Sequence, residues 1–124
     1  MLYEEELTNK IIGAAIEVHR ALGPGLLESA YHACLAHELT LRGVPFESEK
    51  SLPVEYQGIK LDCGYRLDFM IANKVVVELK AVESVNSMHE AQLLTYLKLT
   101  GCKVGLIMNF NVAILKNGIT RKVL

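Results

Sequence analysis

The chain has 124 residues, of which 51% are hydrophobic and 22% charged, and its net charge at pH 7 is −1. These values predict a single folded domain over residues 1–124, exclude a disordered chain, and give no overall attraction to nucleic acid. No apolar run reaches the roughly 18 residues that cross a membrane, and no basic and apolar leader opens the chain, so we expect a cytoplasmic protein with no membrane partner.

Two amphipathic helices are predicted at the start of the chain. Apolar residues recur at three- and four-residue steps from Glu4 to Leu22, and acidic residues occupy the first turn. Gly23-Pro24-Gly25 ends this helix. A second helix is predicted from about Leu26 to Leu41, where Gly43 ends it and Pro45 prevents its continuation.

The pattern then changes to β-strand. One strand is predicted from Phe46 to Tyr56, and Gln57-Gly58 forms a hairpin turn into a long strand from Ile59 to Ile71. Gly64 marks a bulge or bend within that strand. Three consecutive valines open the next predicted strand, Val75–Lys80, which we expect to be buried on both faces.

The last third of the chain predicts a helix from Met88 to Thr100 and a buried strand from Lys103 to Asn109. Two short strands, Val112–Leu115 and Ile119–Val123, flank an Asn-Gly turn signal and predict a C-terminal hairpin. The order of elements is α-α-β-β-β-α-β plus this hairpin. It predicts an α/β fold in which helices flank a mixed β-sheet.

Charged residues interrupt two neighbouring strands that are otherwise apolar. Glu78 and Lys80 are two residues apart, so they project from one face of their strand. A three-residue loop at 72–74 would place Asp68 of the preceding strand opposite Glu78, with Cβ atoms within about 5.5 Å. A two-residue loop would instead pair Asp68 with Leu79.

Two carboxylates this close raise each other's pKa unless a cation lies between them. An Asp and a Glu beside a Lys are what a Mg²⁺ site for phosphodiester hydrolysis needs. The hard cation takes carboxylate oxygens, and the ammonium group orients or deprotonates water or offsets phosphate charge. The alternative is a cross-strand ion pair of Lys80 with Asp68 or Glu78 on a solvated face.

Further motifs accompany these strands at fixed intervals. Residues 25–31 read G-x-x-E-x-x-Y, Asp68 stands in Y-R-L-D-F, and residues 75–80 read V-V-x-E-L-K. A-Q-L-L-x-Y-L follows at 91–97, and the next strand ends in M-N-F. In this order, over nearly the whole chain, the sequence resembles the GxxExxY family of the PD-(D/E)XK nuclease superfamily.

The resemblance implies a restriction-endonuclease-like core and six catalytic residues: Glu28, Asp68, Glu78, Lys80, Gln92 and Tyr96. By position, Asp68 and Glu78 would be metal ligands with Glu28 as an additional ligand, and Lys80 would be the catalytic lysine. The remaining two match a Gln-x-x-x-Tyr element that shapes the active site. We expect Tyr31 to lie in the core, with its hydroxyl group able to reach Glu28, and we expect the histidines to be structural or at the surface.

The predicted function is a nuclease, a hydrolase that cuts phosphodiester bonds of DNA, with RNA as the second choice, using Mg²⁺ or Mn²⁺. The resemblance is incomplete, since no Pro precedes Asp68 and no DNA-wrapping appendage is present. The alternative is therefore a catalytically silent interaction or regulatory domain with the nuclease fold, for which a homodimer is one arrangement. A phosphohydrolase acting on a small nucleotide is a third possibility.

Overall fold

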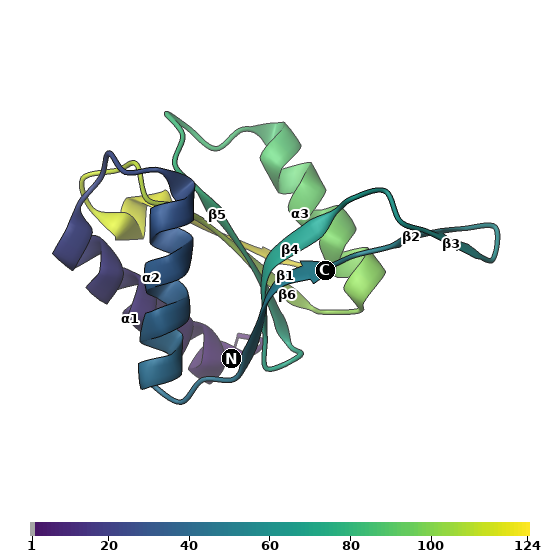
Figure 1. The fold of residues 1–124 in the computed structure, drawn as a ribbon, viewed down its shortest axis with the longest axis horizontal. Coiled ribbons are helices and arrows are strands. Elements are labelled where there is room, and N and C mark those ends of the chain that lie inside the picture. The colour runs from purple at the N-terminus through teal and green to yellow at the C-terminus, as the bar shows by residue number, and fades with distance from the viewer. Residues whose placement is uncertain (1) are drawn as a thin grey trace.

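A mixed five-stranded sheet forms the centre of the computed structural model, which describes residues 2–124 (Figure 1). Residue 1 of the predicted domain lies outside the described residues. In spatial order, the strands are β1 (Phe46–Ser51), β4 (Arg66–Ile71), β5 (Val75–Lys80), β6 (Val104–Asn109) and β7 (Ile119–Val123). The helices are α1 (Glu5–Leu22), α2 (Glu28–Leu41) and α3 (Ser87–Thr100). The predicted α/β arrangement, with helices flanking a mixed sheet, is confirmed.

Strand direction changes at the centre of this sheet. Strands β1 and β4, β4 and β5, and β6 and β7 pair antiparallel, whereas β5 and β6 run parallel. A parallel pair needs a crossover connection, and α3 supplies it between β5 and β6. The strands β5 and β6 each have a neighbouring strand on both sides, and they are almost fully buried.

Side chains that alternate along β5 build two cores on opposite faces of the sheet. Val75, Val77 and Leu79 pack with α1 and α2, whereas Val76 packs in the cluster that includes α3. Helix α3 approaches the sheet closely at Gly105, where an added Cβ atom would lie 2.7 Å from a methyl carbon of the Leu93 side chain. By the same alternation, Glu78 and Lys80 lie on the α3 face.

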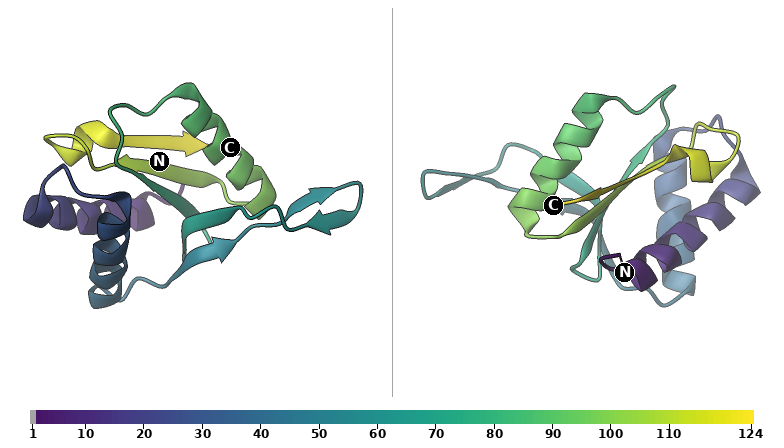
Figure 2. Two further views of the ribbon diagram at one scale, coloured as in Figure 1. Left: turned by 45° about the horizontal axis from the view of Figure 1, so that its top comes forward. Right: turned by 180° about the vertical axis from the view of Figure 1, so that it is seen from behind.

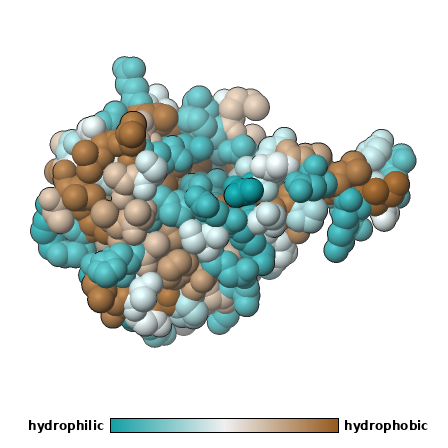
Figure 3. All heavy atoms as spheres, viewed as in Figure 1, coloured by the Kyte–Doolittle hydropathy of each residue, from teal (hydrophilic) through white to brown (hydrophobic). Residues whose placement is uncertain are grey.

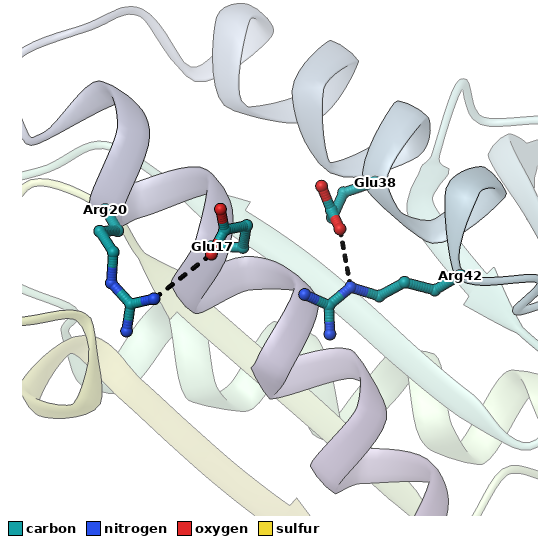
Figure 4. A network of polar contacts seen from close by, with 4 residues as sticks. All are labelled: Glu17, Arg20, Glu38 and Arg42. Atoms are coloured by element: carbon teal, nitrogen blue, oxygen red, sulfur yellow. Dashed lines mark hydrogen bonds and ion pairs between the residues drawn. The ribbon is translucent and has the colours of Figure 1, made fainter.

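Helices α1 and α2 pack together, and Figure 4 shows two ion pairs beside their contact. Arg20 lies 3.3 Å from Glu17 of its own helix, and Arg42 lies 2.7 Å from Glu38. Such partly exposed pairs contribute little to stability, so apolar packing holds these helices in place. Within residues 2–124, none of the helices combines the length and apolar character that crossing a membrane requires.

A separate two-stranded sheet projects from the body of the molecule as an arm (Figures 1 and 2). Its strands are β2 (Val54–Tyr56) and β3 (Ile59–Leu61). The turn between them has Gln57 at φ 50° and Gly58 at φ 79°, the positive angles that the tightest hairpin turns require. The hairpin turn predicted at these two residues is confirmed. Figure 3 shows hydrophobic residues on the arm.

The arm is separate because the two long strands predicted here are interrupted. The prediction of two continuous strands, from Phe46 to Tyr56 and from Ile59 to Ile71, is wrong. Residues 52–53 and 62–65 are not in strands. Pro53 has no N–H group to donate to a strand partner. On the other side, Gly64 adopts a φ of 78°, so the predicted bend at this glycine is confirmed.

The C-terminal hairpin differs from the predicted one. Residues Leu115–Gly118 form a short 3-10 helix, η1. Strand β7 pairs with β6, so the prediction of a partner strand at Val112–Leu115 is wrong. Gly118 passes so close to the end of β6 that an added Cβ atom would lie 2.2 Å from the Asn109 carbonyl oxygen. Glycine is needed there for this close approach, and the Asn-Gly pair does not make a two-residue hairpin turn.

Candidate active site

The β4–β5 hairpin opens where its two acidic residues meet. Its main-chain pairing ends at Phe69 and Val77, in the register that a three-residue loop predicts. Beyond that pair, the Asp68 N–H donates to Glu78 Oε2 at 2.8 Å, and the Leu79 N–H donates to Asp68 Oδ2 at 2.8 Å. The two carboxylates therefore replace main-chain acceptors and are fixed between the strands.

Burial makes these carboxylates unusual acids. Glu78 is only 6% exposed, and this burial, followed by the charge of Asp68, raises the pKa of Glu78 to about 8. Burial also raises the pKa of Asp68, although the hydrogen bond from Leu79 opposes the shift. The charge of Lys80 lowers both pKa values but does not cancel the effect of burial, so the positive charge near the pair compensates it only in part.

Glu28 reaches this pair from the first residue of α2. Burial and then the charge of Asp68 raise the pKa of Glu28, whereas Lys80 and two histidines lower it. The three predicted metal ligands, which come from separate segments of the chain, therefore act on one another electrostatically.

Tyr31, three residues after Glu28, holds the start of α2 in place. Its hydroxyl group donates to the Gly23 carbonyl at 2.6 Å and accepts from the Leu26 N–H at 3.1 Å, and its ring stacks on Phe110 at 4.5 Å. The predicted core position of Tyr31 is confirmed. Its hydroxyl group bonds to the turn before α2 and not to Glu28, so it positions that carboxylate through the main chain.

Lys80 ends β5 and is half-buried on the same face as Glu78. None of the ion pairs among residues 2–124 involves Lys80, so the alternative of a cross-strand ion pair is not formed. Its charge nevertheless lowers the pKa of Glu28, Asp68 and Glu78. The ammonium group is therefore close to the acids and keeps its hydrogen-bonding capacity for another partner.

Helix α3 contributes the last two predicted residues. Tyr96 is 5% exposed, and burial followed by the charge of Glu78 raises its pKa to about 12. Gln92, one turn earlier, is exposed and lines a groove with Tyr96. Tyr96 packs in one buried cluster with Leu67 and Val76 of the two strands that carry the acids, and Gln92 lies one turn away at an exposed position of α3.

Two histidines also lie near the acids, and sequence reasoning assigned them no role there. His32 stacks on Phe69 at 4.4 Å, contacts Ser48 Oγ at 2.6 Å, and lowers the pKa of both Glu28 and Asp68. Its position four residues after Glu28, on the same face of α2, is the signal that could have indicated it. His89 lowers the pKa of Glu28 and caps the start of α3.

The acids suit a hard divalent cation by their chemistry. Three carboxylates oppose the single ammonium group of Lys80, and Asp68 and Glu78 each use one carboxylate oxygen in a main-chain bond and keep the other. Over residues 2–124, no three or more His, Cys, Asp or Glu side chains are already arranged as a metal-binding group. The donor set fits Mg²⁺ or Mn²⁺, and binding would need the side chains to converge further.

The sheet and the acids at its opening define a nuclease-like α/β protein. The sequence model described as the PD-(D/E)XK nuclease superfamily matches residues 5–122, and the chain belongs to this superfamily. The predicted restriction-endonuclease-like core is thereby confirmed. No curated protein and no solved structure was found to match the chain. Membership indicates nuclease-type activity on a nucleic-acid substrate, and nucleases of this superfamily generally use divalent metals.

Proposed function

We propose that this protein hydrolyses phosphodiester bonds of DNA in a reaction that depends on Mg²⁺ or Mn²⁺. The observation that supports the proposal is the pair of hydrogen bonds that fixes Asp68 and Glu78 at the open end of the β4–β5 hairpin, with Lys80 on the same face of β5 as Glu78. Glu28, the first residue of α2, is coupled to this pair electrostatically. These residues supply acidic oxygen ligands and one unpaired ammonium group in a half-buried site.

The carboxylates would hold the metal ion, with Asp68 and Glu78 as the fixed ligands and Glu28 as the adjustable one. A divalent ion held there would polarise the scissile phosphate and lower the pKa of a bound water molecule. The main-chain hydrogen bonds of the two fixed ligands keep their carboxylate planes in place without a metal. This rigidity is a form of preorganisation, which reduces the cost of reaching the transition state.

Lys80 and Tyr96 would contact the reacting groups as hydrogen-bond donors. The ammonium group of Lys80 has no carboxylate partner, so it can stabilise the hydroxide that forms from the attacking water or donate to a phosphate oxygen. Tyr96 has a pKa of about 12 and therefore remains a hydrogen-bond donor at neutral pH. Gln92 offers an amide group next to it for positioning the strand.

The test is hydrolysis by matched variants. Glu78→Gln and Lys80→Ala are compared with Glu83→Gln and Lys74→Ala, which alter an exposed acid and an exposed lysine outside the site. Substrates are single-stranded DNA, duplex DNA and RNA of one sequence, with Mg²⁺, Mn²⁺ or EDTA. We expect each site variant to lose about 10²–10³-fold in rate, as removal of one transition-state donor does elsewhere, and the controls to cut normally.

Wild-type protein that cuts no faster than the two site variants would refute the nuclease proposal. A second measurement then examines the catalytically silent alternative. Millimolar Mg²⁺ should raise the melting temperature of the wild type and not of Asp68→Asn, because only a protein that binds the ion is stabilised by it. The absence of both activity and a metal-dependent shift would favour the interaction domain, and cleavage of RNA alone would change the substrate.

A further inference from the structure

A groove of about 500 Å³ lies between α3 and the root of the arm. It is lined by Gln92, Thr95 and Tyr96 on one side and by Val54 and Tyr65 on the other. Figures 1 and 2 show α3 passing beside the place where the arm leaves the sheet. Its volume lies in the range of sites that bury a small molecule or a single chemical group of a larger ligand.

The lining of this groove favours a flat ring over a phosphate group. None of its lining residues is Lys or Arg, and most of the exposed lining is apolar. Tyr65 is 45% exposed and meets Tyr96 in a T-shaped arrangement at 6.3 Å, so the pair places an exposed aromatic ring in the groove. Gln92 and Thr95 add an amide and a hydroxyl group that can bond to the polar edge of a ring.

The groove is continuous with the candidate active site through Tyr96. This residue lines the groove, and it packs in one buried cluster with Leu67, which precedes Asp68 on β4, and with Val76, which shares a face of β5 with Glu78. A ligand group in the groove would therefore lie next to whatever the carboxylates act on.

We propose that the groove receives an unpaired base of a single-stranded nucleic acid, stacked on Tyr65, while the adjoining phosphate lies at the carboxylates. The inference rests on the proposed function for the site and adds the form of its substrate. Proteins that bind single strands use aromatic platforms because unpaired bases expose their ring faces. A duplex hides these faces and presents phosphates, which demand basic residues that neither the groove nor the net charge of −1 supplies.

The test measures binding without cleavage. Fluorescence anisotropy in EDTA and low salt compares a labelled single strand with the same strand in a duplex. We expect the single strand to bind more tightly, and Tyr65→Ala to weaken its binding roughly 5- to 150-fold, the range that base–aromatic stacking corresponds to. Tyr65→Phe should retain the affinity. Tyr56→Ala, which removes an exposed tyrosine of the arm outside the groove, should have no effect.

A second variant keeps the test independent of any folding defect in Tyr65→Ala. Thr95→Phe would fill the groove from an exposed position on α3, and it should weaken single-strand binding without changing duplex binding. Equal affinity for the two forms, binding unaffected by both groove variants, or no binding of either form would overturn the proposal. The last result would direct attention to a protein ligand for the apolar groove.

The outcome is separable from that of the nuclease proposal because the binding assay contains no metal. Protein that binds a single strand through Tyr65 and cuts nothing with Mg²⁺ or Mn²⁺ would refute the nuclease and leave the groove assignment standing. Protein that cuts duplex and single strand equally, with no effect of Tyr65→Ala on either rate, would refute the groove assignment and support the nuclease.

Discussion

Replacing Glu78 by glutamine should stabilise the metal-free protein at alkaline pH. Glutamine has nearly the shape of the protonated glutamic acid, and its carbonyl oxygen can accept the hydrogen bond that the Asp68 N–H donates to Glu78. It cannot ionise. The substitution therefore removes one buried titratable group and keeps the packing and the hydrogen bond.

The magnitude follows from the pKa of Glu78, which burial and then the charge of Asp68 raise from 4.5 to about 8 in the folded protein. Between these two values the folded state holds a proton that the unfolded chain has released, so the wild type loses stability as the pH rises. The loss is complete above about pH 8. At 1.36 kcal/mol per pKa unit, it totals on the order of 5 kcal/mol.

Urea unfolding in EDTA from pH 5 to pH 9, followed by circular dichroism because the chain has no tryptophan, measures the effect. We expect Glu78→Gln and wild type to be similarly stable near pH 5 and to diverge steadily up to pH 8. Glu83→Gln, an exposed control, should follow the wild type. Parallel pH curves for wild type and Glu78→Gln would refute the view that Glu78 is a buried acid whose charge is compensated only in part.

Two further predictions concern residues that hold the site from outside. Tyr31→Phe removes the hydroxyl group that bonds to Gly23 and Leu26, so we expect a loss of about 1–2 kcal/mol in urea unfolding and slower hydrolysis because the start of α2, which carries Glu28, is held less firmly. Unchanged stability and rate would contradict this role. Asn109→Ala leaves the N–H groups of Val82 and Asn111 without their side-chain acceptor and should cost about 2–3 kcal/mol, whereas an unchanged urea midpoint would show that water replaces the amide group.

The central hairpin could be predicted because local sequence determines it. Three valines require a buried strand, and the positive φ angles of Ala72 and Asn73 allow the short loop that sets the register. Once the loop length is fixed, side-chain alternation places Asp68 opposite Glu78. This much of the candidate site depends on contacts between residues close in sequence.

Contacts between distant segments could not be predicted in the same way. The ring of His32 stacks on Phe69 of β4. Helical spacing can place His32 on the same face of α2 as Glu28, but it cannot reveal that this face meets Phe69. The mistaken strand at Val112–Leu115 has the same origin. An Asn-Gly pair there suits a hairpin turn, but Gly118 is instead required by the close approach of the Asn109 carbonyl oxygen.

The open end of the β4–β5 hairpin shows why these acids are better explained by function than by folding. Asp68 and Glu78 accept bonds from two main-chain N–H groups that ordinary strand pairing would satisfy without any buried charge. With apolar side chains at these two positions, main-chain carbonyl groups of the paired strands would accept the same hydrogen bonds. The desolvation that raises both pKa values would then not arise. Two close carboxylates kept at such a cost in stability, with a lysine free of ion pairs on the same face, are therefore the feature on which the proposed metal site rests.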